Sequence, residues 1–153
     1  VIHPQSIVHS LVEYVDGSTL AQASPPNMKG PIAYAMQWPD RLTNATAPIN
    51  WSAEQTWTFA PINNEKYPAI DLARRCGEVG GGVPTIFNAS NEVAVAAFID
   101  GKIGFTSIMD IVDATVQKLG PASTAALRDL ADVSGVEENA RSVAAEVMKK
   151  WVA

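Results

Sequence analysis

The chain has 153 residues, of which 47% are hydrophobic and 18% charged, and its net charge is −5 at pH 7. These values favour one folded domain, or one small element joined to a helical domain, and they exclude wholesale disorder. The acidic balance argues against nucleic acid as a partner, and no apolar run reaches the roughly 18 residues that a membrane helix needs.

The first part of the sequence predicts a β-hairpin. It begins Val-Ile-His-Pro-Gln, without an initiator methionine or a basic-then-apolar leader, and we expect it to belong to a longer protein. Residues 7–15 are rich in β-branched side chains, which is typical of a strand. Asp16-Gly17 predicts a two-residue type I′ turn, because that turn needs positive φ at both central positions, and 18–23 would be the returning strand.

The hairpin register predicts which residues meet at its open end. A two-residue loop pairs His9 with Ser24, whereas a bulged three-residue loop would shift the pairing by one. The chain then enters Pro25-Pro26-Asn27-Met28, where two prolines must end the ladder. We therefore expect His9 and Met28 to be neighbours.

A short helix and an irregular segment follow. The helix is expected to begin with Pro31 at its first position and to end before Trp38-Pro39. Residues 40–66 show no sustained period but carry several large aromatics, which favours an irregular connector packed along the protein surface. The best candidate for a short strand within it is 56–59.

The rest of the chain has a helical period, and each predicted helix has one apolar stripe, so the helices should bury against one another. The predicted helices are 68–76, stopped by glycines at 77 and 80–82, then 84–100, 106–119, 123–130 and a last helix that begins at a capping box, Ser134 to Glu137. The only cysteine, Cys76, cannot form an internal disulfide and favours a reducing compartment. The predicted fold class is an α+β fragment: a β-hairpin plus short helix, an irregular connector, and a small antiparallel α-helical bundle.

The two histidines and Met28 are the first candidates for chemistry. A histidine could shuttle a proton, donate to a phosphate oxygen or bind a metal. His3 and His9 would share one face of an extended chain, but no third metal ligand has a recognisable spacing, and a hydrogen-bonded structural role is favoured for one of them. Met28 is interpreted either as a gap-filling apolar contact, which is favoured, or as a flexible wall over a flat ligand.

Asn88, Asn91 and Glu92 form a second polar group. They could bind a polar ligand, but the favoured interpretation is a brace to backbone groups of the facing connector. The glycines at 80–82 do not match a phosphate-binding loop, because no Lys-Ser or Lys-Thr follows. The residues alone reveal no Ser-His-Asp pattern and no spaced carboxylate pair, and hence no complete active site.

Three stretches of sequence carry a resemblance to a known family: HPQSIVHSLVEYVDGS, LAQASPPNMKGPIAYAMQWP and FNASNEVAVAAF. They resemble the C-terminal part of the 1-deoxy-D-xylulose-5-phosphate reductoisomerase family. The resemblance implies that 1–39 is the end of a central catalytic and dimer-forming domain, 40–66 a connector, and 67–153 the C-terminal helical bundle. It also implies an intact oxidoreductase of the methylerythritol phosphate route to isoprenoids. That enzyme converts 1-deoxy-D-xylulose 5-phosphate to 2-C-methyl-D-erythritol 4-phosphate by rearrangement and NADPH reduction.

The resemblance further implies which residues and partners belong to the site. His9 would lie beside the substrate and metal, and Pro26 and Met28 in a loop over the nicotinamide and substrate. The intact enzyme would use NADPH and a divalent metal (Mn, Mg or Co). Their binding residues would lie upstream, so no cofactor or metal is expected on this chain, and we expect it to be inactive alone. A phosphosugar substrate, a homodimer formed through the hairpin sheet and a cytoplasmic location are also implied.

Two alternatives remain open at this point. The chain could be a non-catalytic dimerisation or assembly module derived from the same family, or a diverged helical domain of unrelated function. The segment that precedes Val1 in the gene would distinguish the enzyme from the assembly module.

Overall fold

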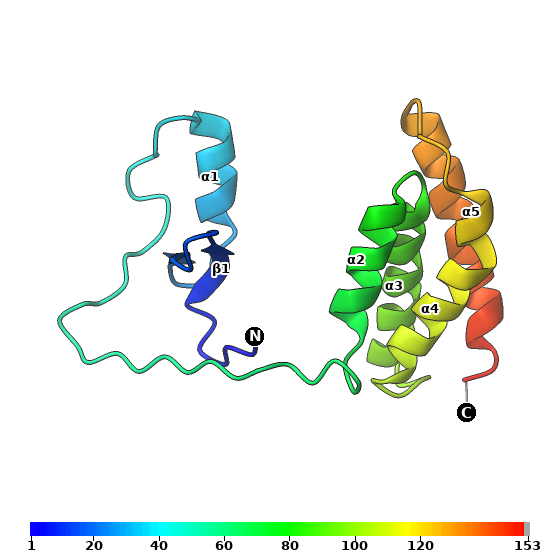
Figure 1. Ribbon diagram of the computed structural model, residues 1–153, viewed down its shortest axis with the longest axis horizontal. Coiled ribbons are helices and arrows are strands. Elements are labelled where there is room, and N and C mark those ends of the chain that lie inside the picture. The colour runs from blue at the N-terminus through cyan, green and yellow to red at the C-terminus, as the bar shows by residue number, and fades with distance from the viewer. Residues whose placement is uncertain (152–153) are drawn as a thin grey trace. The chain divides into compact units, whose positions relative to one another are not determined.

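The computed structural model describes residues 1–151, which form two units that divide between Ile62 and Asn63. The first unit contains β1 (Val8–Glu13), β2 (Thr19–Ala23) and α1 (Lys29–Gln37). The second contains α2 (Ala69–Val79), α3 (Val83–Ile99), α4 (Ser107–Leu119), a 3₁₀ turn η1 (Gly120–Ala122) and α5 (Leu130–Met148) (Figure 1). The predicted α+β fold class, with a hairpin followed by a helical bundle, is confirmed.

The hairpin turn has three residues, not two. Tyr14 accepts a hydrogen bond from Gly17 N–H (2.9 Å) and donates its own N–H to Ser18 (2.8 Å). Gly17 has φ +84°, but Asp16 is not in the positive-φ region, so the predicted type I′ turn is wrong. The Asp16 carboxylate instead accepts from Ser18 N–H (2.9 Å) and Ser18 Oγ (2.6 Å), which lowers the pKa of Asp16.

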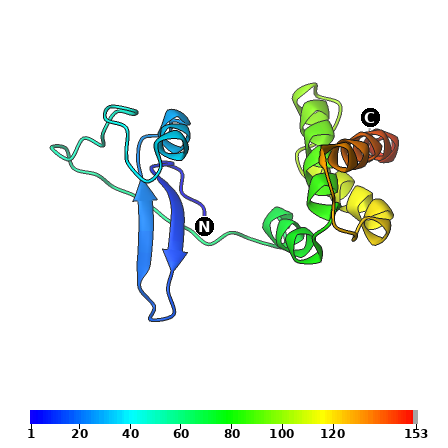
Figure 2. The same ribbon diagram turned by 90° about the horizontal axis from the view of Figure 1, so that it is seen from above.

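The register is consequently shifted by one from the two-residue prediction. Near the turn, Glu13 pairs with Thr19 and Val12 with Leu20, as expected for the three-residue alternative. Figure 2 shows the two strands side by side, with the turn at the far end from α1.

Helix α1 begins two residues earlier than predicted, at Lys29. Pro31 is its third residue, where proline is tolerated because the first N–H groups of a helix have no intrahelical acceptor. Asn27 Oδ1 accepts from Lys29 N–H (2.9 Å) just before the first turn. The helix ends where Trp38 adopts an extended conformation before Pro39, as predicted.

The connector returns to the start of the chain. No strand forms over 56–59, and that prediction is wrong; a single antiparallel bridge joins Ile2 to Ala60 instead. Beside it, the rings of His3 and Phe59 stack at 4.5 Å. The backbone groups of Thr58 are bonded by the side chains of His3 and Gln5 and not by the backbone of a neighbouring strand, so no ladder forms there.

The helical unit has its core along α3. This helix packs against both α4 and α5, α4 also packs against α5, and α2 lies against α3 (Figure 1). Alanines are prominent where α3 packs against α5: Ala89 shares a core cluster with Ala140, and Ala94 shares one with Ala144. The buried side chains of this unit include Ile86, Ala89, Ala94, Ala97, Ile111, Val112, Ala140 and Ala144.

The helix boundaries of the helical unit agree with the sequence for α3 and α4 but differ from it at three other places. α2 continues past Cys76 and through Gly77, and it stops at Gly80 with φ +71°. The predicted helix over 123–130 is absent, and only the short η1 turn precedes that segment.

Helix α5 also begins before the predicted capping box. Its N-cap is Asp129, whose carboxylate accepts from Asp132 N–H at 2.9 Å. Ser134 and Glu137 lie inside the helix, so the prediction that it starts at Ser134 is wrong. Asp129 takes the capping role because an aspartate oxygen can satisfy an otherwise free N–H of the first turn.

The hairpin unit has no core of its own. None of residues 1–62 is buried, whereas every buried residue among those described belongs to the helical unit. Within residues 1–151, no helix combines the length and apolar character needed to cross a membrane.

Candidate functional site

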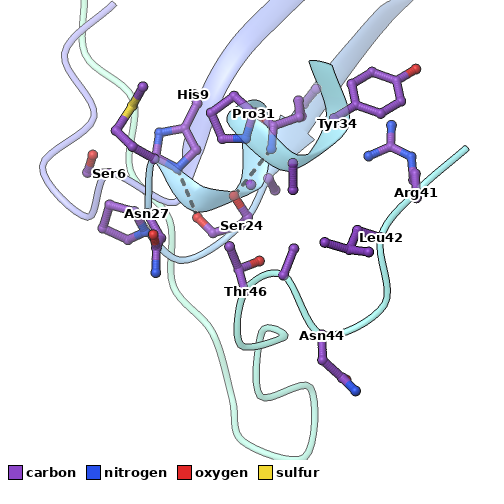
Figure 3. Close-up of a pocket in the computed structure, with 18 residues that line it drawn as sticks. Ser6, His9, Ser24, Asn27, Pro31, Tyr34, Arg41, Leu42, Asn44 and Thr46 are labelled. Atoms are coloured by element: carbon purple, nitrogen blue, oxygen red, sulfur yellow. Dashed lines mark hydrogen bonds between the residues drawn. The ribbon is translucent and has the colours of Figure 1, made fainter. Parts of the chain in front are cut away.

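The hairpin unit contains a hollow of about 1080 Å³. It lies between β2, the loop that follows β2, the first turns of α1 and the connector residues 41–46 (Figure 3). Its polar lining includes His9, Asn27, Tyr34, Arg41, Asn44 and Thr46.

His9 lies on a β-bulge at the edge of this hollow. Val8 pairs with Ala23 and Ser10 with Gln22, so His9 is the extra residue between two pairs. A bulge re-aims the side chain that it carries, and bulges are frequent beside active sites. His9 is thereby turned toward the end of β2 and the loop that follows.

The hydrogen bond of His9 defines what its ring can do. His9 Nε2 is 3.0 Å from the carbonyl oxygen of Ser24 (Figure 3). A carbonyl oxygen only accepts, so Nε2 carries the proton in this arrangement. Nδ1 has no partner among the residues that the structure describes, and its lone pair can accept a hydrogen bond or a proton, or bind a metal.

The loop after β2 brings the other two predicted residues to the same hollow. Pro26 and Met28 line it together with His9, so the structure assembles all three predicted substrate-proximal residues. Met28 is 71% exposed. A side chain that fills a gap within this unit would be buried, so the exposure of Met28 argues against that interpretation. Their contact with a substrate stays a prediction.

The sequence did not single out Arg41, which brings positive charge to the hollow. Its guanidinium lies 4.3 Å from the ring centroid of Tyr34, a cation–π contact between the connector and α1. No carboxylate pairs with Arg41 among the described residues. A lone arginine in a segment without periodicity gives no signal that reasoning from one sequence could use.

His3 is a structural histidine, unlike His9. Its Nδ1 lies 2.9 Å from the carbonyl oxygen of Thr58, and its Nε2 accepts from Ile7 N–H at 3.1 Å. Both ring nitrogens are therefore occupied, and the conceivable metal site between His3 and His9 would have only one nitrogen free.

Asn88 and Glu92 of the polar group on α3 form a brace, but it joins α5 and not the connector as expected, and Asn91 has no side-chain hydrogen bond among the described residues. Asn88 Nδ2 donates to Glu92 Oε1 (3.1 Å), and Arg141 of α5 donates to Glu92 Oε2 (2.6 Å) and to Glu137. The bond from Arg141 lowers the pKa of Glu92 below its usual value, and the two carboxylates raise the pKa of Arg141.

Two features bear on metal and phosphate binding: the grouping of ligating side chains and the glycine turn at 80–82. Residues 1–151 contain no group of three or more His, Cys, Asp or Glu side chains that could hold a metal ion. The glycine turn at 80–82 is filled by protein: a Cβ on Gly81 would lie 2.6–2.7 Å from the carbonyl oxygens of Ser123, Thr124 and Ala125. Carbonyl oxygens would repel a phosphate, so this turn does not suit the pyrophosphate of a dinucleotide.

Comparison with known proteins gives consistent matches. The family profile "DXP reductoisomerase C-terminal domain" matches residues 23–143. The 1-deoxy-D-xylulose 5-phosphate reductoisomerases of Kitasatospora griseola and Nocardia farcinica are 47% and 50% identical over 147 residues. Those matches cover 96% of this chain but only 38% and 37% of the relatives, so the chain spans little more than a third of their length.

Solved structures agree with this. The Zymomonas mobilis reductoisomerase in complex with NADPH has a TM-score of 0.80 and 39% identity, covering 96% of this chain and 38% of that one. A DOX-P reductoisomerase in complex with NADPH, fosmidomycin and magnesium has a TM-score of 0.81 and 35% identity, with the same coverage.

Proposed function

This chain belongs to the 1-deoxy-D-xylulose 5-phosphate reductoisomerase family, and we propose that it is the C-terminal part of an active enzyme of that family. The intact protein would convert 1-deoxy-D-xylulose 5-phosphate to 2-C-methyl-D-erythritol 4-phosphate, with NADPH as reductant and Mn, Mg or Co as the divalent metal. The observation that carries the proposal is the meeting of His9, Pro26 and Met28 on one hollow.

In this proposal the hairpin unit supplies one wall of the site. His9, held through Nε2 by Ser24, offers Nδ1 to a hydroxyl or a water molecule of the substrate complex. Met28 offers an adaptable apolar surface to a flat ring such as nicotinamide. NADPH would supply the hydride, and the residues that hold it and the metal would come from the part of the relatives that this chain does not cover.

The division of the chain is part of the same proposal. Residues 1–39 would end the catalytic domain, 40–66 would be the connector, and 67–153 the helical bundle. A cytoplasmic location is included because the free thiol of Cys76 suits a reducing compartment.

A homodimer through the hairpin sheet is proposed because the hairpin leaves apolar surface uncovered. Val12 and Leu20 pair directly across the strands and are 53% and 64% exposed. A two-stranded hairpin is marginally stable alone, and unpaired strand edges bind other strands. The uncovered apolar surface also supports the second candidate function, a non-catalytic assembly module. Residues 1–62 bury no side chain, and a unit of this kind would gain stability by packing against a second copy.

The test compares the full-length protein with this 153-residue chain. NADPH consumption is followed with 1-deoxy-D-xylulose 5-phosphate and magnesium, and NADPH binding and molecular mass are measured in parallel. We expect turnover and a dimer for the full-length protein, and neither turnover nor NADPH binding for the 153-residue chain. A full-length protein that dimerises without turnover would establish the assembly module instead. Tight NADPH binding by the 153-residue chain would overturn the assignment of the cofactor site to upstream residues.

A further inference from the structure

We infer that His3 is a positioning residue for His9, and this inference rests on the proposed function of His9. Four hydrogen bonds link the two rings to each other and to the connector. His3 Nδ1–H donates to the Thr58 carbonyl (2.9 Å), and His3 Nε2 accepts from Ile7 N–H (3.1 Å). The Ile7 carbonyl accepts from Ser24 N–H (2.9 Å), and the Ser24 carbonyl accepts from His9 Nε2–H (3.0 Å).

The partners of each ring select one tautomer. At His3, a carbonyl requires a donor at Nδ1, whereas the Ile7 N–H requires a lone pair at Nε2. His3 is therefore the neutral Nδ1–H form. At His9 the bond to Ser24 selects the opposite form, with the proton on Nε2 and the lone pair on Nδ1.

The hydrogen bond that Ile7 N–H donates to His3 Nε2 stabilises the turn over residues 3–6, which is unfavourable by itself. Ser6 N–H donates to the His3 carbonyl (3.1 Å), and Ser6 has φ +50°, a conformation that is costly for a residue other than glycine. The imidazole bonds the very next N–H, that of Ile7. Ile7 leads directly into β1, so this turn sets where the strand begins.

We call the four hydrogen bonds from Thr58 through His3, Ile7 and Ser24 to His9 the relay, and its end at Thr58 is also fixed. Thr58 N–H donates to Gln5 Oε1 (3.2 Å), and Gln5 Nε2 donates to Thr58 Oγ1 (3.0 Å). The His3 ring stacks on Phe59 at an interplanar angle of 11°. The connector thus offers the carbonyl of Thr58 to His3 from a defined position.

The bulge converts the position of Ile7 into the orientation of His9. The hydrogen bond between Ile7 and Ser24 is separated from the bulge only by the pair Val8–Ala23, and Ser24 is also the partner of His9. If Ile7 moves, Ser24 moves with it, and the acceptor that selects the His9 tautomer is displaced. His3 need not contact the substrate to affect it, so it is a positioning residue and not a catalytic one.

Two substitutions separate the two bonds of His3. In His3→Gln the side-chain Oε1 can replace Nε2 as the acceptor for Ile7 N–H. In His3→Asn the side-chain Nδ2 can replace Nδ1 as the donor to Thr58, but no acceptor reaches Ile7. Phe59→Leu is the matched control, since it removes the stacking and leaves both bonds of His3.

The experiment uses the full-length protein with ¹⁵N-labelled histidine rings, whose nitrogen shifts report the tautomer. We expect His9 as Nε2–H in the wild type, His3→Gln and Phe59→Leu, and a mixture of tautomers in His3→Asn. The ratio kcat/KM should fall about tenfold or more in His3→Asn and stay within about threefold of the wild-type value in His3→Gln. An unchanged His9 tautomer in His3→Asn would overturn the relay, whatever the turnover of that variant.

The wild type alone also tests the relay, without relying on any variant to fold. A His3 signal from the Nε2–H tautomer would contradict it. If the wild type has no turnover, the proposed function fails, while the ring signals still decide whether His3 sets the tautomer of His9. If the wild type is active but His9 is indifferent to His3→Asn, only the relay fails.

Discussion

His9 and Ser24 are 15 residues apart in the chain, yet His9 Nε2 lies 3.0 Å from the Ser24 carbonyl oxygen. The bulge at His9 makes this contact possible, because it inserts His9 between the pairs Val8–Ala23 and Ser10–Gln22. One ring nitrogen orients the side chain through this bond, and the other has no hydrogen-bond partner among the described residues.

The first prediction concerns His9 in the full-length enzyme. His9→Ala should lower turnover or weaken substrate binding, with kcat/KM reduced about tenfold or more, because both the oriented ring and its Nδ1 lone pair are lost. The melting temperature of the helical unit should not change, since the described contacts of His9 all lie in residues 1–62. Steady-state kinetics and circular dichroism check the two expectations.

His9→Gln is the matched variant for this prediction. A glutamine amide can still donate to the Ser24 carbonyl, but it has no equivalent of the Nδ1 lone pair. We expect His9→Gln to be as slow as His9→Ala. Recovery of turnover in His9→Gln would mean that the bond to Ser24 is the whole role of His9, and unchanged turnover in His9→Ala would make it a purely structural residue.

The hairpin could be predicted from the sequence, but its turn type and its bulge could not. β-branched residues and Asp16-Gly17 predicted its existence, but the turn type depended on whether Asp16 adopts positive φ. The two bonds from Ser18 to the Asp16 carboxylate decide that, and they are invisible to propensity. The bulge then follows from a mismatch, because the pairing at Glu13 and the pairing at Val8 differ by one residue in register.

Candidate site residues could be predicted only where the sequence resembles a known family. His9, Pro26 and Met28 were predicted in that way; the structure places all three around one hollow, and their role stays a prediction. Arg41 and Tyr34 were missed because their contact joins a helix to a segment without a period. No local pattern encodes a contact of this kind.

The start of α5 supplies the second prediction. The sequence predicted Ser134 as the N-cap of this helix, whereas Asp129 is the N-cap in the structure. Asp129→Ala should therefore destabilise the helical unit by about 1 kcal/mol, and Asp129→Asn should restore most of that loss. Ser134→Ala should be neutral or slightly stabilising, because Ser134 is inside the helix and alanine has the higher helix propensity. Urea unfolding measures the difference, and a larger loss in Ser134→Ala would favour the capping box instead.

The glycine turn before α3 supplies the third prediction. Gly81 has φ +57°, and an added Cβ would collide with three backbone carbonyl oxygens. Gly81→Ala should cost at least about 2 kcal/mol of unfolding free energy, since neither the backbone conformation nor the neighbouring backbone can yield cheaply. Urea unfolding of the full chain measures this cost.

Gly77 and Gly135 are the controls for that prediction. Both lie inside helices, and a Cβ at either position meets nothing within 4 Å. Gly77→Ala and Gly135→Ala should each stabilise the helical unit by about 0.5–1 kcal/mol, because alanine loses less backbone entropy in a helix. Equal effects at positions 77 and 81 would contradict the close approach of the 123–125 carbonyls.

The fourth prediction concerns pH and the brace between α3 and α5. Hydrogen bonds lower the pKa of three carboxylates in the helical unit: Glu92 through Arg141, Asp132 through Arg128, and Glu146 through Lys118. A carboxylate whose pKa is lower in the folded state binds fewer protons there than when unfolded. Its stabilising contribution is complete above the unfolded pKa, about 4.3 for glutamate, and is lost as pH falls through the folded value.

The unfolding midpoint of the wild type should therefore be constant from about pH 7 to 5 and should fall below about pH 4.5. Glu92→Gln should start from a lower midpoint at neutral pH and fall less steeply in acid, because it lacks one of the titrating groups. Glu138→Gln is the matched control, since Glu138 lies on α5, is exposed and has no hydrogen bond or ion pair among the described residues. It should follow the wild-type curve at every pH. Thermal unfolding monitored by circular dichroism distinguishes them, and an acid slope in Glu92→Gln equal to that of the wild type would show that Arg141 does not anchor α5 to α3 through Glu92.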